Sequence, residues 1–387
     1  MILFGELDEM LHFISFFMKR CLLWISLFCL LLVSFVSNSL LNVDKIALDD
    51  LPQDAPKIEL VSCIALNYKG IDRIGSVCQM KYRNGEFYLF DREQGLIMAF
   101  DSDGNETGRV KALGHGVGEY IQPMSFDVDA EGNVFVADAA KGAVYEYSRP
   151  DFKFKRKINV RTNFCGLGVV NENEFWITSF YDGKSYDGKL AYYNAVREEL
   201  KTVCKPVARG ECKVPQGCCM DLFRSDSVLY FYERFTPLAY RLNGGGICSD
   251  TLFIESENLP TKKNIKEWGG SSAKMRTSGK IIDISALYME NGNALITLDY
   301  NAITRLWCSA EQGGFVKFTF FGNREVDKLN TFVYAVADSY YVSYMYVDEF
   351  LSASKKAKSE VAAKAAERLN ENIGDANVVL LLYSLRD

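Results

Sequence analysis

The stretch LGHGVGEY (113–120) alternates three glycines with other residues, a pattern that could surround a phosphate group. A dinucleotide-binding loop needs its glycines to leave a strand and open a helix, whose N–H groups then face the pyrophosphate. Here the chain continues as EYIQPMSFDVD, where Pro123 and the alternation of apolar with polar residues indicate a strand. The stretch therefore predicts a connection between two strands, in which glycine permits positive φ. A ligand-binding loop stays the alternative.

Histidine is too rare for a multi-histidine zinc site, because His12 and His115 are the only two in the chain. No nucleophile elbow, Ser/His/Asp arrangement or phosphate-binding P-loop is visible. We therefore expect no cofactor and no transition-metal site. A calcium ion stays possible, because hard cations need only oxygen ligands.

The cysteines divide into a cluster and scattered single residues. Eleven occur, two of them (Cys21 and Cys29) in the N-terminal apolar run, so nine remain and at least one thiol is unpaired. The cluster CKPVARGECKVPQGCC lacks a CxxC pair and a nearby histidine, which argues against zinc and favours a disulfide in an oxidising compartment. Its pairing stays open among Cys204, Cys212, Cys218 and Cys219. Small apolar strand positions are predicted for Cys63, Cys78, Cys165, Cys248 and Cys308.

The first residues have the pattern of an export leader. Met18-Lys19-Arg20 is followed by an apolar run from Cys21 to Val36, so Met18 is predicted to be the true start. The run is short for a bilayer span, and Ser37 and Ser39 supply the small residues of a cleavage site after Ser39. We expect residues 1–39 to be a cleaved leader and the protein to be periplasmic or associated with the cell envelope. An uncleaved anchor, which would be the sole membrane contact, is the alternative.

The composition favours a large, mostly β fold. A chain of 387 residues with 48% hydrophobic content can bury a substantial core. Its 26 Phe and 21 Tyr against 8 Pro suit half-buried pleated surfaces. The net charge of −6 argues against nucleic acid as a partner, which would require clustered Lys and Arg.

Short strands with period-two alternation recur along the chain. Six of them, most led by Gly or Asn, are GEFYLFD (85–91), GNVFVAD (132–138), NEFWITS (173–179), SVLYFYE (227–233), NALITLD (293–299) and SYYVSYM (339–345). Their spacing brackets the length of a four-stranded propeller blade. A parallel β/α fold would need helical crossovers, yet no strong amphipathic helix appears before residue 350. The pattern predicts an all-β, six-bladed β-propeller.

The two ends of the domain are predicted to meet in the last blade. KIELVSCIAL (57–66) is a strand before the first blade, and ANVVLLLYSL (376–385) is a strand after the last Tyr-rich pair. If the N-terminal strand becomes the outer strand of blade six, the ring closes without a frayed edge. Residues 40–387 are then expected to form one propeller domain.

Several stretches together resemble a known family. The order YLFDREQGLIMAFDSDGNE (88–106), LGHGVGEY, SFDVDAEGNVFVADAAKGAVYEY (125–147) resembles the six-bladed β-propellers of exported bacterial proteins, akin to TolB-like and NHL-like propellers. In that family the glycine stretch is close to GxGPGEY, and Val117 stands here where the proline would be. The resemblance implies the fold and export. It implies no particular activity, because the family has none in common.

The glycine stretch is expected to share one face of the propeller with the turns that follow the second strand of each blade. Polar and aromatic residues of these turns would surround the mouth of the central channel as ligand-binding candidates. They are Asp91, Arg92, His115, Glu119, Tyr120, Asp138, Tyr181, Glu233, Arg234, Asp299 and Tyr300. Solvated turn residues are the alternative interpretation.

One segment, 350–374, is strongly helical and interrupts the last blade. Its alanines favour a helix, and Val361, Ala365, Leu369 and Ile373 fall on one face. We expect this face to be buried with the helix lying at the channel mouth as a partial lid. A surface helix facing away from the channel is the alternative.

Because no motif carries chemistry, the sequence favours a binding or scaffolding module over an enzyme. The ligand would be an extracytoplasmic glycan, peptide or protein. The alternative is a calcium-dependent hydrolytic enzyme of the lactonase or lyase kind, with oxygen ligands in the channel.

Overall fold

The computed structural model describes most of the chain from Lys45 onward. The described residues are 45–52, 54, 57–179, 189–204, 222–225, 228–232, 235, 238–269, 271–290, 293–300, 302–308, 315–318, 328–330, 332–371 and 376–386. Residues 44–387 form one compact unit. Outside the described residues lie the predicted leader (1–39), Tyr181, Glu233, Arg234, Cys212, Cys218 and Cys219.

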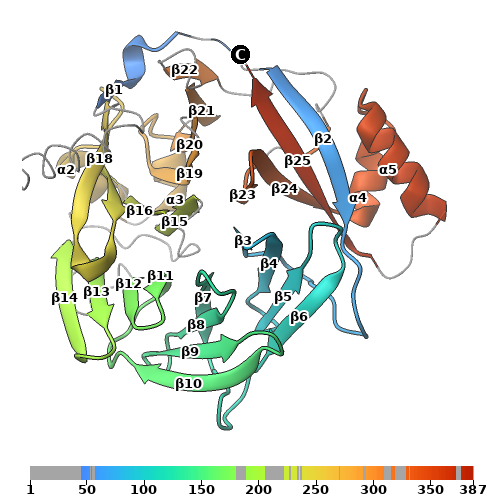
Figure 1. Ribbon diagram of the computed structural model, residues 1–387. Coiled ribbons are helices and arrows are strands. Elements are labelled where there is room, and N and C mark those ends of the chain that lie inside the picture. Colours follow the sequence, from blue (N-terminus) through green and yellow to red (C-terminus); the bar gives the residue numbers. More distant parts are fainter. Residues whose placement is uncertain are drawn as a thin grey trace, which may run out of the picture. The chain divides into compact units, whose positions relative to one another are not determined.

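The chain folds as the predicted six-bladed β-propeller (Figure 1). Blade one consists of β3 (Gln79–Arg83), β4 (Glu86–Asp91), β5 (Leu96–Phe100) and β6 (Glu106–Lys111). Blade two consists of β7 (Pro123–Val128), β8 (Val134–Asp138), β9 (Ala143–Ser148) and β10 (Lys153–Asn159). Blade three consists of β11 (Gly166–Asn171), β12 (Glu174–Thr178), β13 (Leu190–Asn194) and β14 (Glu199–Cys204).

The remaining blades follow the same antiparallel order. Blade four consists of β15 (Leu222–Ser225), β16 (Val228–Tyr232), β17 (Leu238–Leu242) and β18 (Cys248–Glu255). The short helices α2 (Lys262–Trp268) and α3 (Ser272–Arg276) lead to blade five, which consists of β19 (Asp283–Glu290), β20 (Asn293–Tyr300), β21 (Ala302–Cys308) and β22 (Phe315–Phe318). Blade six consists of β23 (Ala335–Ala337), β24 (Tyr340–Tyr346), β25 (Val378–Arg386) and β2 (Lys57–Ala65).

Each of the six segments aligned in the sequence is the second strand of a blade. These strands are β4, β8, β12, β16, β20 and β24. The first hairpin illustrates why the turns are legible in the sequence. Asn84 and Gly85 connect β3 to β4 with φ of 52° and 75°, and two consecutive positive φ values are what Asn-Gly tolerates best.

The first strands of the blades surround the centre of the unit. β3 contacts β7, β7 contacts β11, β11 contacts β15, and β15 contacts β19, while β23 contacts β3. Residues on the first strand of any blade are therefore close to residues on the first strands of other blades, although the chain separates them widely.

The predicted closure of the ring by the N-terminal strand is confirmed. β2 pairs antiparallel with β25, placing Ile58 opposite Leu385 and Leu60 opposite Tyr383 (Figure 1). Blade six is thus built from both ends of the described chain, and no strand edge is left between the first and last blades.

The segment before β2 adds contacts that the sequence did not predict. β1 (Lys45–Ala47) extends blade four as a fifth strand, parallel to β18. Farther along, the backbone of Lys317 in β22 donates to Pro52 and accepts from Asp54. The N-terminal segment therefore contacts the outer strands of blades four and five before it completes blade six.

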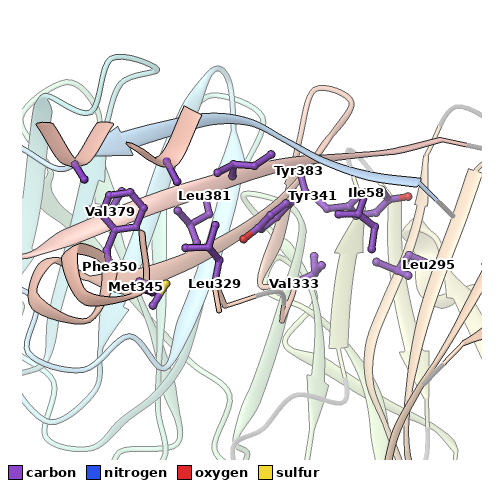
Figure 2. Packing of buried hydrophobic residues seen from close by; sticks show 14 of the residues in the cluster. Ile58, Leu295, Leu329, Val333, Tyr341, Met345, Phe350, Val379, Leu381 and Tyr383 are labelled. Atoms are coloured by element: carbon purple, nitrogen blue, oxygen red, sulfur yellow. The ribbon is translucent and has the colours of Figure 1, made fainter. Parts of the chain in front are cut away.

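Blade five and two helices pack on one face of the blade-six sheet. Alternate residues Val379, Leu381 and Tyr383 of β25 point to this face, because side chains of a strand alternate sides. Leu295 of blade five and Phe350 belong to the same core (Figure 2). Val378, Leu380 and Leu382 face blade one instead.

The helical insertion is present, but the lid prediction is wrong. α4 (Val347–Ser354) and α5 (Glu360–Glu371) stand between β24 and β25, and α5 packs against β2, the outer strand of blade six (Figure 1). The buried stripe of α5 is Ala362, Ala366 and Leu369. Val361 and Ala365 are only partly buried, and Ile373 lies outside the described residues. The helices extend the apolar core at the periphery, so they lie away from the channel.

Candidate functional site

The glycine stretch forms a closed turn between β6 and β7, as predicted. Leu113 and Tyr120 form an isolated bridge, and the N–H of Gly114 donates to the carbonyl of Tyr120. Gly118 has φ of 78°, and a Cβ added there would meet the ring of Phe154 at 2.6 Å. Glycine is required at this position for both backbone and packing reasons.

The glycine stretch lies, as predicted, beside the turns that follow the second strands of blades one and two. The buried Tyr120 donates from its hydroxyl to the carbonyl of Gly95 in the β4–β5 turn, at 2.6 Å. Lys141 in the β8–β9 turn donates to the carbonyl of Glu119 at 2.9 Å. The glycine stretch therefore joins the turns of blades one and two.

Asp91 and Asp138 end the second strands of blades one and two, and both are buried acceptors of backbone N–H groups. The carboxylate of Asp91 accepts from the N–H of Gly75 at 2.8 Å and of Ser76 at 2.9 Å. That of Asp138 accepts from Ile121 at 2.9 Å, and also from Gln122, Ala140 and Lys141. These contacts hold the loop entering each blade against the turn that follows its second strand.

The hydrogen bonds also stabilise the ionised form of Asp91. Burial by itself would raise its pKa, but the hydrogen bonds from backbone N–H groups and from Gln94 outweigh burial and lower the pKa. The ionised carboxylate of Asp91 therefore stabilises the fold through these hydrogen bonds.

The other predicted candidates are dispersed. Arg92 is partly exposed in its turn, His115 is exposed, and Glu119 accepts from the N–H of Gly116 within the glycine stretch. Asp299 and Tyr300 end β20, and nothing is described of their side chains. The structure places Glu119, Tyr120 and Asp138 in neighbouring turns of one cluster, with His115 exposed in the same glycine stretch, and their role in ligand binding stays a prediction.

A pocket lies instead among the first strands of blades one, four, five and six. Its lining comprises residues 78–82, residues 222–224, Tyr288 and residues 333–336. Among the candidates whose side chains the structure describes, none lines it. The lining combines two cations, Lys81 and Arg224, with several aromatic rings. Such a mixture of apolar surface and few polar groups is typical of ligand sites.

A buried polar cluster beside this pocket joins four blades. Arg224 of β15 donates to the carboxylate of Asp127 in β7, with an Nη2–Oδ2 distance of 2.5 Å. Arg224 also donates to the carbonyl of Val169 in β11, whose N–H donates to Asp127 at 2.8 Å. Lys81 of β3 completes the cluster, with its Nζ 4.0 Å from Asp127 Oδ1.

The charges of the cluster are strongly coupled. Burial would raise the pKa of Asp127, but Arg224 and Lys81 outweigh it, and the pKa of the carboxyl is lowered. Burial lowers the pKa of Lys81; Asp127 opposes this effect and Arg224 adds to it. Asp127 is therefore held as an anion, whereas burial disfavours the charged form of Lys81 and a nearby anion favours it.

Aromatic rings extend from the pocket along blade six. Tyr334, which lines the pocket, lies 4.9 Å from Phe332 and 4.8 Å from Tyr344, measured between ring centroids. Tyr344 in turn lies 5.8 Å from Tyr346, whose hydroxyl donates to the carbonyl of Gly75. The row thus connects the pocket to the loop that Asp91 holds.

The sequence carried a signal for this cluster that its motifs did not reveal. Lys81, Asp127 and Arg224 are charged residues within the short first strands QMKYR, PMSFDV and LFRS, where a core strand would be apolar. Opposite charges at similar places in different blades indicate an ion cluster. Which blades face each other can be known only from the fold.

Among the described residues, no group of three or more His, Cys, Asp or Glu side chains could hold a metal ion. Cys165 and Cys308 are buried, as predicted for apolar strand positions, and burial raises the pKa of Cys63 to about 12. Cys204 lies at the end of β14.

Comparison with known proteins supports the assignment of the fold. Residues 54–301 match the family DUF5128, described as a 6-bladed beta-propeller. The chain belongs to this family. No curated protein matches the chain.

Several solved structures are similar to this DUF5128 propeller. One is a protein of Bacteroides fragilis NCTC 9343 to which export is ascribed, with a TM-score of 0.74, 16% identity, 89% of this chain covered and 100% of the other. A DUF4221 protein of Bacteroides vulgatus ATCC 8482 has a TM-score of 0.47 and 11% identity, with 86% of this chain covered and 100% of the other. The virginiamycin B lyase of Staphylococcus aureus has a TM-score of 0.37 and 11% identity, with 72% of this chain covered and 78% of the other.

Proposed function

We propose that this propeller is an exported binding or scaffolding module. Its ligand would lie in the channel pocket, the pocket lined by residues 78–82, 222–224, Tyr288 and 333–336. The pocket among the first strands of four blades carries the proposal. It offers charged groups and aromatic rings on rigid strands, which is the arrangement that binds a ligand with little reorganisation. The ligand would be a glycan, a peptide or a segment of another protein.

Export is supported by two independent observations. Met18-Lys19-Arg20 and the apolar run from Cys21 to Val36 have the order of an export leader. The protein of the same fold from Bacteroides fragilis is one to which export is ascribed. Among the described residues, no helix is long and apolar enough to cross a membrane. The finer placement among TolB-like or NHL-like propellers is part of this proposal and rests on the motifs at 88–106 and 125–147.

Binding is favoured over hydrolysis because two of the predicted carboxylates, Asp91 and Asp138, and the carboxylate of Asp127 already have partners in the fold. The carboxylates of Asp91 and Asp138 accept hydrogen bonds from backbone N–H groups, and that of Asp127 is paired with Arg224. A calcium-dependent enzyme would need several of these oxygens in one place and facing the channel. Calcium titration with thermal melting tests this alternative, because a large calcium-dependent gain in stability would revive it.

A thermal-shift screen of the exported chain against glycans and peptides tests the binding proposal, with each hit confirmed by calorimetry. Tyr334→Ala should weaken binding of a confirmed ligand, because Tyr334 lines the pocket. Tyr340→Ala is the matched control: Tyr340 is also a partly buried tyrosine of blade six but does not line the pocket. A ligand that binds both variants equally would place the site elsewhere.

The location of the protein is tested separately. N-terminal sequencing of material from the cell envelope should find a chain that begins near Leu40. Recovery of a chain that retains residues 18–36 would show an anchored protein instead.

A further inference from the structure

The polar cluster beside the pocket combines two cations, Lys81 and Arg224, with the buried carboxylate of Asp127. Both cations contact this carboxylate. Their side chains are 14% and 6% exposed, so bulk water screens them poorly. An anion in the pocket would therefore interact strongly with Lys81.

The two cations are not equally satisfied. Arg224 donates to both oxygens of Asp127 and to the carbonyl of Val169. Within the part of the chain that the structure describes, the ammonium of Lys81 has only the ion pair with Asp127, at 4.0 Å, which is too long for a hydrogen bond. An ammonium has three N–H donors, and Lys81 lines the pocket. The unused donors are therefore accessible from the pocket.

The surroundings of Lys81 suit an organic anion better than a bare ion. Tyr82, Tyr288 and Tyr334 line the same pocket, so rings lie within reach of whatever the ammonium holds. Aromatic faces contact apolar groups and sugar rings at small entropic cost. An acidic group and the carbon skeleton attached to it would both find partners.

We propose that the pocket binds the carboxylate or phosphate of an organic ligand, with Lys81 as the charged donor to that group. This proposal rests on the channel pocket being the ligand site. It restricts the ligand to an acidic glycan, an acidic peptide or a phosphorylated compound. Carboxylate and phosphate present similar oxygens to an ammonium, and the test below distinguishes them.

A purely structural role for Lys81 predicts a different result for its removal. A buried cation without hydrogen bonds costs free energy, and Lys81→Met would leave Asp127 paired with Arg224. Without an anion, Lys81→Met should therefore melt at the same temperature as the native protein or higher. A lower melting temperature would mean that Lys81 holds the blades together, which would overturn the proposal.

Calorimetry on the exported chain at pH 7 and low salt provides the binding test. The probes are inorganic phosphate, D-glucuronate and D-glucose, the last being the uncharged counterpart of glucuronate. The variants are Lys81→Met, Lys81→Arg and the control Lys153→Met, whose side chain is 82% exposed on β10. At least one of the two anions should bind, about tenfold or more weakly to Lys81→Met, because a hydrogen bond to a charged group is lost. Lys81→Arg should restore binding, and Lys153→Met should not change it.

The outcomes separate this inference from the proposed function. Binding of glucuronate alone would assign a carboxylate, and binding of phosphate alone would assign a phosphate. Failure of both anions to bind, or equal affinity of Lys81→Met, would overturn the inference. If glucose binds as tightly as glucuronate and Tyr334→Ala abolishes both, the channel is a site for neutral ligands: the proposed function stands and the anion inference falls.

Discussion

Replacing Asp127 by Asn would test how much the channel cluster contributes to stability. The side chain of Asp127 is fully buried, and Asn has nearly the same shape, so the substitution removes charge without creating a cavity. The N–H of Val169 could still donate to the amide oxygen. Arg224 and Lys81 would lose the anion that they share.

The expected loss is large, because removing one partner of a buried ion pair leaves an uncompensated charge and costs about 3–5 kcal/mol. For a unit of this size, that corresponds to a fall in melting temperature of about 4–7 °C. The matched control is Asp151→Asn. Asp151 pairs with Lys153 at the surface, where the two side chains are 60% and 82% exposed, so its loss should change stability little.

The pH dependence gives a second signature. The pKa of Asp127 is lowered in the folded protein, so its contribution is fully present above the unfolded carboxyl pKa of about 3.9 and is lost as pH falls below it. The difference between the native protein and Asp127→Asn should therefore be constant from pH 7 to about pH 5 and shrink at lower pH. Urea unfolding at several pH values measures it. Two results would refute the conclusion that the charge of Asp127 stabilises the fold. One is an Asp127→Asn variant as stable as Asp151→Asn, and the other is a difference in unfolding free energy from the native protein that stays unchanged down to pH 3.

Three further substitutions test the architecture. Ile58→Ala should cost about 2–5 kcal/mol in chemical unfolding because it empties part of the core that closes the ring. Val61→Ala on the same strand, 36% exposed, should cost little, and equal losses would refute the closure argument. Leu369→Asp should remove amide-exchange protection from α5 and β2, while the first strands of the blades stay protected. Loss of protection in those first strands would contradict the peripheral position of α5. Asp138→Asn should lower thermal stability by about 1–3 kcal/mol, since one oxygen acceptor becomes a donor facing backbone N–H groups, and an unchanged melting curve would contradict its structural role.

The local features of this fold could be predicted from the sequence. Period-two alternation and turns such as Asn84-Gly85 are determined by neighbouring residues, so all six second strands are predictable from the sequence alone. The closure of the ring by residues 57–65 could also be predicted from the sequence. A repeat array with one unpaired strand at each end leaves no exposed strand edge when these two strands pair with each other. The glycine stretch was correctly predicted as a turn, since Pro123 and the strand after it exclude a helix.

What the sequence left open depends on contacts between distant residues. The apolar stripe of α5 predicted a buried face but did not identify what covers it. In the structure α5 packs on β2, because blade five covers another part of the same face of the blade-six sheet. The channel cluster is the clearest case. Asp127 and Arg224 are 97 residues apart, and although each is an unusual charge within a first strand, nothing local shows that they pair. Only closure of the ring brings the first strands of the blades together, removes these side chains from water and makes their pairing an energetic necessity.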